Sequence, residues 1–271
     1  MQIISSPIMD IQGIRLETQT IRPDTTHAGP TLVFLHEGLG SVALWRDWPA
    51  KLCAQLGCAG LVYSRQGYGL SDAPPDVRGP SRTENGQRHG RLLPDYMHRE
   101  ALEVLPALLH ALGIESPVLL GHSDGGTIAL LHASQHPVSA CVVMAPHVIV
   151  EPESVQAIEA AREAYLHGNL RERLSRYHDD VDSAFWQWND VWLSPGFRNF
   201  DIREDCRRIQ APVLAIQGRQ DPYGTLQQIE DIRPDHGRIE RCVLEHCGHV
   251  PQRDQTQACT QRIVGFLASC P

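Results

Sequence analysis

Several kinds of sequence feature are missing from this chain, and each absence excludes a class of protein. The 271 residues contain no run of about 18 apolar residues, so the sequence predicts no membrane span. Its first residues carry neither a basic region nor a long apolar segment, so we expect no signal peptide and a cytoplasmic protein. The eight cysteines should then be reduced.

Signatures of nucleic-acid, cofactor and metal binding are also missing. The net charge is −8 and no cluster of basic residues stands out, so we expect no nucleic-acid partner. There is no dinucleotide fingerprint and no P-loop, and we expect no cofactor. Cys242 and Cys247 lie near His246 and His249, but their spacing does not match a zinc pattern, which predicts buried thiols and no metal site.

Short apolar runs alternate with helix-like segments along most of the chain. This alternation predicts a mostly parallel sheet that is covered by helices on both faces. Active residues should then gather at the carboxyl ends of the strands. After an antiparallel strand pair around Gly13, we expect strands at 31–35, 59–63, 118–121, 139–144, 213–218 and 238–244, and helices near 44–56, 97–112, 126–136, 225–233 and 255–268.

The most informative motif is Gly121-His122-Ser123-Asp124-Gly125, a G-x-S-x-G segment between an apolar run and a helix-like stretch. A strand, a sharp turn through glycines and then a helix form the context of a nucleophile elbow. Side chains at the two glycine positions would collide with a neighbouring strand or helix. The motif therefore predicts that the Ser123 hydroxyl is presented at the N-terminus of the following helix, where negative charge is stabilised.

Two more residues follow expected strands further along the chain. Asp221 comes after the buried run 213–218, and His249 lies in the loop after the strand at 238–244. Serine needs a base within hydrogen-bond reach, and an imidazole titrates near neutral pH. His246 is a rival for the base, although Gly-His-x-Pro favours His249. Glu245 is a rival for the acid, and a nucleophilic role for Asp124 is not expected.

The order Ser, Asp, His, each after a strand, resembles the α/β-hydrolase superfamily from about residue 10 to the end of the chain. The resemblance implies an α/β-hydrolase fold with a mostly parallel eight-stranded sheet. It also implies a helical cap inserted after the sixth strand. We therefore expect a core of residues 1–146 and 206–271 and a cap of residues 147–205.

A fourth element of the resemblance is the segment His36 to Ser41, which is similar to the family's H-G-x-x-G segment. The family's roles, carried over, make Ser123 the nucleophile, His249 the base and Asp221 the residue that orients it. They place the oxyanion hole at the backbone N–H groups of Gly38 and Asp124. Glu37 stands where the family has glycine; it either faces the pocket or pairs with an arginine.

Candidate substrate contacts come from the expected cap and the loops beside it. The cap segment is rich in aromatic residues, which either pack on the core or line the pocket. His147 and Glu151 follow the strand at 139–144 and contact substrate, support the triad or form the cap hinge. The polar segment 72–95 is a flap or is disordered, and its arginines attract an anion or are solvated. The candidate substrate contacts are Glu37, His147, Trp186, Trp188 and Trp192.

These features predict a serine hydrolase that cleaves a small to medium carboxylic ester, thioester or lactone, acting on a small-molecule substrate as a monomer or homodimer. The resemblance is to capped bacterial esterases and to enol-lactone and meta-cleavage-product hydrolases. The latter cleave a C–C bond with the same triad, so C–C cleavage stays open. A ligand-binding sensor with little turnover is the alternative from another class, and a purely structural protein would leave the four matched elements unexplained.

Overall fold

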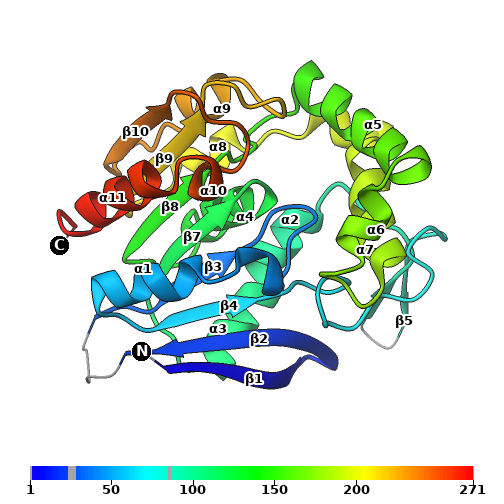
Figure 1. Cartoon of the computed structure of the whole chain (residues 1–271), viewed down its shortest axis with the longest axis horizontal. Helices are drawn as coiled ribbons and strands as arrows, with labels where there is room; N and C mark the ends of the chain where they lie inside the picture. The colour runs from blue at the N-terminus through cyan, green and yellow to red at the C-terminus, as the bar shows by residue number, and fades with distance from the viewer. Residues whose placement is uncertain (1, 24–28, 85–86, 271) are drawn as a thin grey trace.

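Eight strands form the main sheet of the computed structural model, which describes residues 2–23, 29–84 and 87–270 (Figure 1). Their order across the sheet is β1-β2-β4-β3-β7-β8-β9-β10. The strands β1 and β2 pair antiparallel, as do β2 and β4, and the remaining neighbours are parallel. The bounds are β1 (Gln2–Ile11), β2 (Ile14–Arg22), β3 (Leu32–Leu35), β4 (Gly60–Tyr63), β7 (Val118–His122), β8 (Ala140–Met144), β9 (Val213–Gly218) and β10 (Ile239–Leu244).

The five central strands are buried at every residue because both faces of the sheet are covered by helices. On one face, α1 (Trp48–Leu56) and α11 (Thr256–Leu267) pack over Phe34 and its neighbours. On the other face, α3 (Leu105–Ala111) and α4 (Asp124–Ala133) pack over Val33 and Leu35. Two apolar cores therefore sandwich the sheet, as the alternation of apolar runs and helix-like segments predicted, and the architecture is the α/β-hydrolase fold that the resemblance implied.

Two expected helices are shorter or more irregular than the sequence pattern indicated. The segment expected as one helix at 97–112 divides into α2 (Tyr96–Arg99), a π-helical stretch (Glu100–Val104) and α3. Pro106 lacks the N–H that would donate to the carbonyl four residues earlier, so the regular ladder is interrupted here. The expected helix at 225–233 is the four-residue α9 (Gln227–Glu230). Within the described part of the chain, no helix has the length and apolarity needed to span a membrane.

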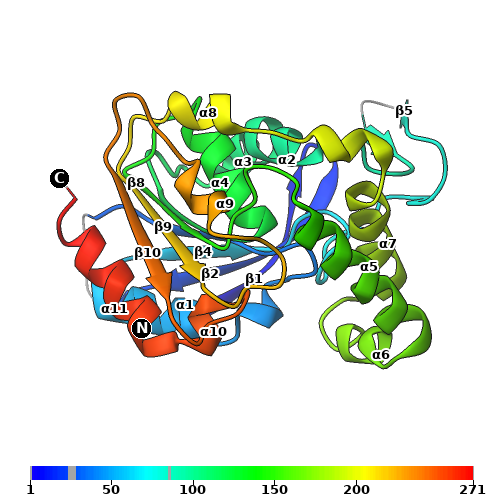
Figure 2. The ribbon, with the colours of Figure 1, turned by 90° about the horizontal axis from the view of Figure 1, so that it is seen from above.

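Helices fill most of the segment between β8 and β9. They are α5 (Pro152–His167), α6 (Leu170–Leu174), α7 (Val181–Trp192), the 3₁₀ helix η3 (Pro195–Asn199) and α8 (Arg203–Arg207). Figure 2 shows α5, α6 and α7 together beside one end of the sheet, whereas α8 lies over the helical layer of the core. The boundary expected at residue 205 therefore falls inside α8, which returns the chain to β9.

The segment 72–95 contains a short hairpin of β5 (Arg82–Glu84) and β6 (Gln87–His89) beside α7, and residues 85–86 lie outside the described residues (Figure 1). Arg78 fastens the segment to α7: its Nε lies 2.8 Å from Asp190 Oδ2, and its guanidinium stacks 3.9 Å from the Trp186 ring. The other arginines also have local partners, namely Arg82 with Glu84, Arg88 with Asp95 and Arg91 with backbone carbonyls. These partners occupy the arginines that could have attracted an anion.

Replacement of Phe34 tests how much the apolar core under α1 and α11 contributes to stability. Its side chain is fully buried and meets the rings of Trp45 and Trp48 edge-on at 5.8 and 5.9 Å. Phe34→Ala should lower the free energy of unfolding by about 3–5 kcal/mol, because it removes apolar contacts and leaves a cavity. The measurement is urea unfolding. Leu70→Ala, at a residue that is 58% exposed, is the control and should change it by less than about 0.5 kcal/mol.

Candidate active site

Ser123 occupies a sharp turn between β7 and α4, with a backbone φ of 53° and ψ of −120°. Two glycines make the turn possible. A Cβ at Gly121 would lie 2.1 Å from the Gly125 carbonyl oxygen, and a Cβ at Gly125 would lie 2.0 Å from the Leu35 carbonyl oxygen. No side chain fits at either position, so the motif glycines let β7, α4 and β3 approach closely enough to hold the strained serine.

Ser123, His249 and Asp221 form one hydrogen-bonded chain of side chains. His249 Nε2 lies 2.9 Å from Ser123 Oγ, and His249 Nδ1 lies 2.9 and 2.8 Å from the two Asp221 carboxylate oxygens. Asp221 also accepts from the Tyr223 N–H (2.8 Å) and from Gln217 Nε2 (2.8 Å). Burial raises the pKa of Asp221, but its bond and charge interaction with His249 outweigh burial and lower it. The arrangement can move the Ser123 proton to His249 beside a fixed carboxylate.

The rival residues lie elsewhere. His246 is exposed and lies in the turn that precedes Cys247. Glu245 forms an exposed ion pair with Arg219, whose Nε is 2.6 Å away. Glu151 accepts from the N–H and hydroxyl of Thr225 (2.9 and 2.6 Å) and from Gln228 (2.6 Å), which ties the start of α5 to α9 and to the segment before it.

The loop after β3 lies beside the elbow, because Leu35 pairs with Gly121 in the parallel register of β3 and β7. Arg65 stabilises this loop, because its guanidinium donates to the carbonyl oxygens of His36 (2.5 Å) and Glu37 (3.1 Å). His178, from the segment before α7, donates from Nε2 to the Leu39 carbonyl oxygen (3.0 Å) and accepts at Nδ1 from the Gly69 N–H (3.0 Å). The backbone around Gly38 is therefore fixed from two sides.

Glu37 pairs with a histidine and not with an arginine. Its Oε2 lies 3.3 Å from His122 Nδ1, while His122 Nε2 lies 2.6 Å from the backbone oxygen of His249. Burial raises the pKa of Glu37, but the hydrogen bond and charge of His122 outweigh it and lower the pKa to about 2. Burial likewise lowers the pKa of His122, and Glu37 outweighs it, so that this pKa is raised. The pair of Glu37 and His122 connects the Gly38 loop to the backbone of the His249 loop.

The side chain of Asp124 belongs to a second buried network. Its Oδ2 accepts from the Tyr96 hydroxyl (2.6 Å) and lies 3.8 Å from the Arg65 guanidinium. The Trp192 indole N–H donates to the same Tyr96 hydroxyl (3.0 Å). Burial raises the pKa of Asp124, although Arg65 and Tyr96 act to lower it. Asp124 is thus linked through its side chain to α7, while its backbone N–H lies at the start of α4.

Two of the three candidate tryptophans, Trp188 and Trp192, lie on one side of α7, and Trp186 lies on the other. The Trp188 indole nitrogen packs against Gly38, since a Cβ built there would lie 2.1 Å from it. Trp192 is buried, and its ring meets the His147 ring edge-on at 4.9 Å. Trp186, two residues before Trp188, projects from the other side of the helix, where Arg78 covers its ring. Trp186 is therefore not retained as a candidate substrate contact.

A family model described as the alpha/beta hydrolase family matches residues 32–262. The chain belongs to this family. Human serine hydrolase BPHL is 26% identical over 208 residues, which cover 73% of this chain and 59% of that protein. The putative carbamate hydrolase RutD of Pseudomonas savastanoi pv. phaseolicola is 24% identical over 265 residues, which cover 89% of this chain and 95% of that protein. Membership of this family, together with the two hydrolase relatives, indicates that the protein is a hydrolase.

Solved structures show the same fold at lower identity. The enol-lactonase from Burkholderia xenovorans has a TM-score of 0.71 at 17% identity, with 97% of this chain and all of that chain covered. A meta-cleavage product hydrolase from Pseudomonas fluorescens has a TM-score of 0.71 at 18% identity, with 98% of each chain covered. At such identities, the likeness extends to the α/β-hydrolase fold alone.

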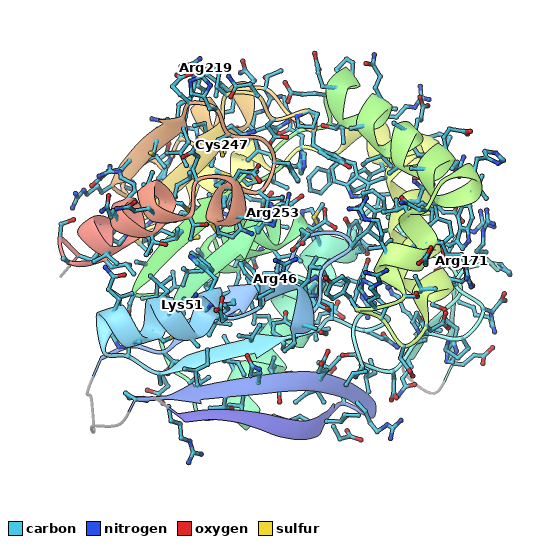
Figure 3. The ribbon with its side chains drawn as sticks, viewed as in Figure 1. Arg46, Lys51, Arg171, Arg219, Cys247 and Arg253 are labelled. Carbon is cyan, nitrogen blue, oxygen red and sulfur yellow. The ribbon has the colours of Figure 1, made fainter. Side chains whose placement is uncertain are left out.

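Metal binding gains no support from the described side chains. They include no group of three or more histidine, cysteine or acidic residues arranged to hold a metal ion. Cys247, which Figure 3 labels, is buried in the loop between β10 and α10 (Pro251–Asp254), and all eight cysteines are free thiols.

Sequence reasoning missed several residues that hold this hydrolase site in place. They are Arg65, His122, Tyr96, His178 and Tyr223, whose ring lies 4.5 Å from that of His249. Arg65 lies in the segment after β4 and His122 stood inside the elbow motif, but neither position indicates a partner. The other three lie in segments without a motif, so no signal in a single sequence pointed to them.

Glu37→Gln tests the buried pair. The contribution of Glu37 is present above its ordinary pKa of 4.5 and is lost as the pH falls toward about 2. The contribution of His122 is present below its ordinary pKa of 6.5 and is lost as the pH rises through its raised folded value. The variant should therefore lose most stability, roughly 2–3 kcal/mol, between these two ordinary values. Urea unfolding at pH 2.5, 5.5 and 9 measures it, and an equal loss at all three pH values would contradict the ion pair.

Proposed function

We propose that the protein is a serine hydrolase that cleaves a small to medium carboxylic ester, thioester or lactone through an acyl-enzyme on Ser123. The observation that carries the proposal is the chain of hydrogen bonds from Ser123 Oγ to His249 (2.9 Å) and on to Asp221 (2.8 Å). This chain supplies a base for a hydroxyl that is otherwise a poor nucleophile. The strained elbow presents that hydroxyl at the first turn of α4.

The proposed reaction has two halves. Ser123 Oγ attacks the carbonyl carbon while His249 Nε2 takes the hydroxyl proton, and Asp221 stabilises the resulting imidazolium. The tetrahedral intermediate collapses, and the leaving oxygen or sulfur takes the proton from His249. Water then attacks the acyl-enzyme with His249 again as base, which releases the acid and restores Ser123.

The oxyanion of each tetrahedral intermediate would accept from the backbone N–H groups of Gly38 and Asp124. Support comes from the parallel register of β3 and β7, which brings the loop after Leu35 beside the elbow. It also comes from Arg65 and His178, which fix that loop. One such donor is worth about 2.7–4 kcal/mol of transition-state stabilisation, provided that it is held in place beforehand.

The helices α5, α6 and α7 would form the cap over this centre. Support comes from Trp188 and Trp192, one turn apart on α7, which pack against Gly38 and His147. Both tryptophans are buried, and so is Ser123, which is 6% exposed. Water is thereby kept from the reacting atoms, which strengthens each electrostatic interaction among them.

A fluorophosphonate should form one covalent adduct on the wild-type protein and none on Ser123→Ala, because only an activated serine reacts. Intact-mass spectrometry measures the adduct, and far-UV circular dichroism checks that the variant is folded. Turnover of p-nitrophenyl butyrate should fall by at least about 10³-fold in the variant. Labelling of the variant, or near-normal turnover by it, would refute Ser123 as nucleophile, and labelling without turnover of any ester would favour a ligand-binding sensor.

Asp221→Asn should lower kcat for the same ester by roughly 10⁴-fold with little change in KM, because an amide favours the wrong tautomer of His249. Steady-state kinetics over a range of ester concentrations separates the two parameters. Glu245→Gln is the matched control at the rival carboxylate. Its kcat should match that of the wild type, and a large loss there would instead make Glu245 the acid.

A further inference from the structure

His147 lies beside the proposed catalytic residues and is fixed there by its backbone. The Thr127 hydroxyl donates to the His147 carbonyl oxygen (2.7 Å) and accepts from the His147 N–H (3.0 Å). Thr127 lies one turn after Ser123 on α4, so the first turn of this helix positions both Ser123 and the backbone of His147. The His147 ring lies 5.8 Å from the His249 ring and 4.9 Å from the Trp192 ring.

The His147 side chain lacks the partner that other buried histidines have. Rings of the buried histidines His36, His122, His132 and His178 each bond a backbone group, at 2.6 to 3.0 Å. By contrast, His147 is 2% exposed and its Nδ1 has no partner among the described residues. A buried polar atom without a partner is costly, so this nitrogen calls for a group that enters from outside the chain.

Two tryptophans of α7 and the short distance from Ser123 limit the length of a group that could bond His147. Trp188 packs on Gly38 and Trp192 packs on His147, and the two tryptophans are four residues apart on α7. The His147 ring lies 5.8 Å from the His249 ring, whose Nε2 lies 2.9 Å from Ser123 Oγ. An acyl group bonded to Ser123 therefore needs only a short chain to reach His147.

The charges around the site favour a neutral group over an anion. Asp221 carries a negative charge against His249, and Glu37 and Asp124 are already balanced by His122 and Arg65. Burial lowers the pKa of His147 to about 3, with a further lowering by His249, so its ring is neutral at physiological pH. A neutral imidazole can share a hydrogen bond with a hydroxyl or carbonyl, whereas it offers a carboxylate no opposite charge.

We propose that His147 binds a neutral oxygen on the acyl group, so that the substrates are esters or thioesters of short hydroxy or oxo acids. The proposal rests on the proposed function, because it assumes that the acyl group is bonded to Ser123 during the reaction. It assigns His147 to substrate recognition and leaves proton transfer to His249. The Trp192 ring packs edge-on against this imidazole at 4.9 Å.

The experiment compares kcat/KM for ethyl butyrate with that for ethyl 2-hydroxybutyrate, 3-hydroxybutyrate and 2-oxobutyrate, and for monoethyl succinate, by pH-stat titration. The wild type should prefer at least one hydroxy or oxo ester over the plain ester. His147→Leu should lower that preference about tenfold, the equivalent of one hydrogen bond, and His147→Gln should restore part of it. His132→Leu removes a buried histidine that is bonded to the Ala101 carbonyl and should leave the ratio unchanged.

A second readout separates the two proposals. Binding of the same esters to Ser123→Ala, followed by quenching of tryptophan fluorescence, reads the subsite without turnover. If fluorophosphonate labelling fails while His147→Leu weakens binding of the hydroxy esters in this background, the proposed function fails, and only the binding of a neutral oxygen by His147 stands. If labelling succeeds, three results would each refute the subsite. They are no preference for any hydroxy or oxo ester, a preference for monoethyl succinate, and a His147→Leu variant that leaves every ratio of kcat/KM unchanged.

Discussion

The close approach of three backbone segments at Gly121 and Gly125 is the constraint on which the rest of the site depends. A single methyl group at either position would come within about 2 Å of a carbonyl oxygen, of Gly125 or of Leu35. Because no side chain separates them, β7 and α4 can meet at the angle that holds Ser123 at a φ of 53°. The loops after β3, β9 and β10 then need only leave the same edge of the sheet to reach the hydroxyl.

Buried charge pairs set the fine geometry around that hydroxyl. Glu37 and His122 connect the Gly38 loop to the backbone of His249, and Arg65 and Asp124 connect it to the start of α4. A buried pair adds little net stability over an apolar replacement, but the loss of one partner leaves a charge without compensation. These pairs therefore act chiefly by permitting one arrangement of the loops. Within each pair the opposite charges compensate each other.

The sequence allowed the sheet, the family and the residues of the hydrogen-bonded chain to be predicted, because each depends on local order. Ser123, Asp221 and His249 each follow an apolar strand, and strand ends in a parallel sheet converge whatever the details of packing. The partner of Glu37 could not be predicted, because His122 and Arg65 are both polar neighbours and only the path of the loop selects between them. The side of α7 that carries Trp186 depended likewise on how the helix is rotated against the core.

The helix α7 is bonded to several segments around the proposed catalytic residues, so it would couple access to the site with the organisation of the site. It is bonded at Asp190 to Arg78, at Gln187 to the Gln66 carbonyl oxygen and at Trp192 to the Tyr96 hydroxyl, which itself donates to Asp124. A movement of α7 large enough to admit a substrate would break these bonds and lift Trp188 from Gly38. Closure would restore them together, so water is excluded at the same moment as the groups around the oxyanion site regain their positions. A substrate whose acyl group bonds His147, next to Trp192, would favour the closed arrangement. Recognition of the acyl group and assembly of the site would then occur in the same step.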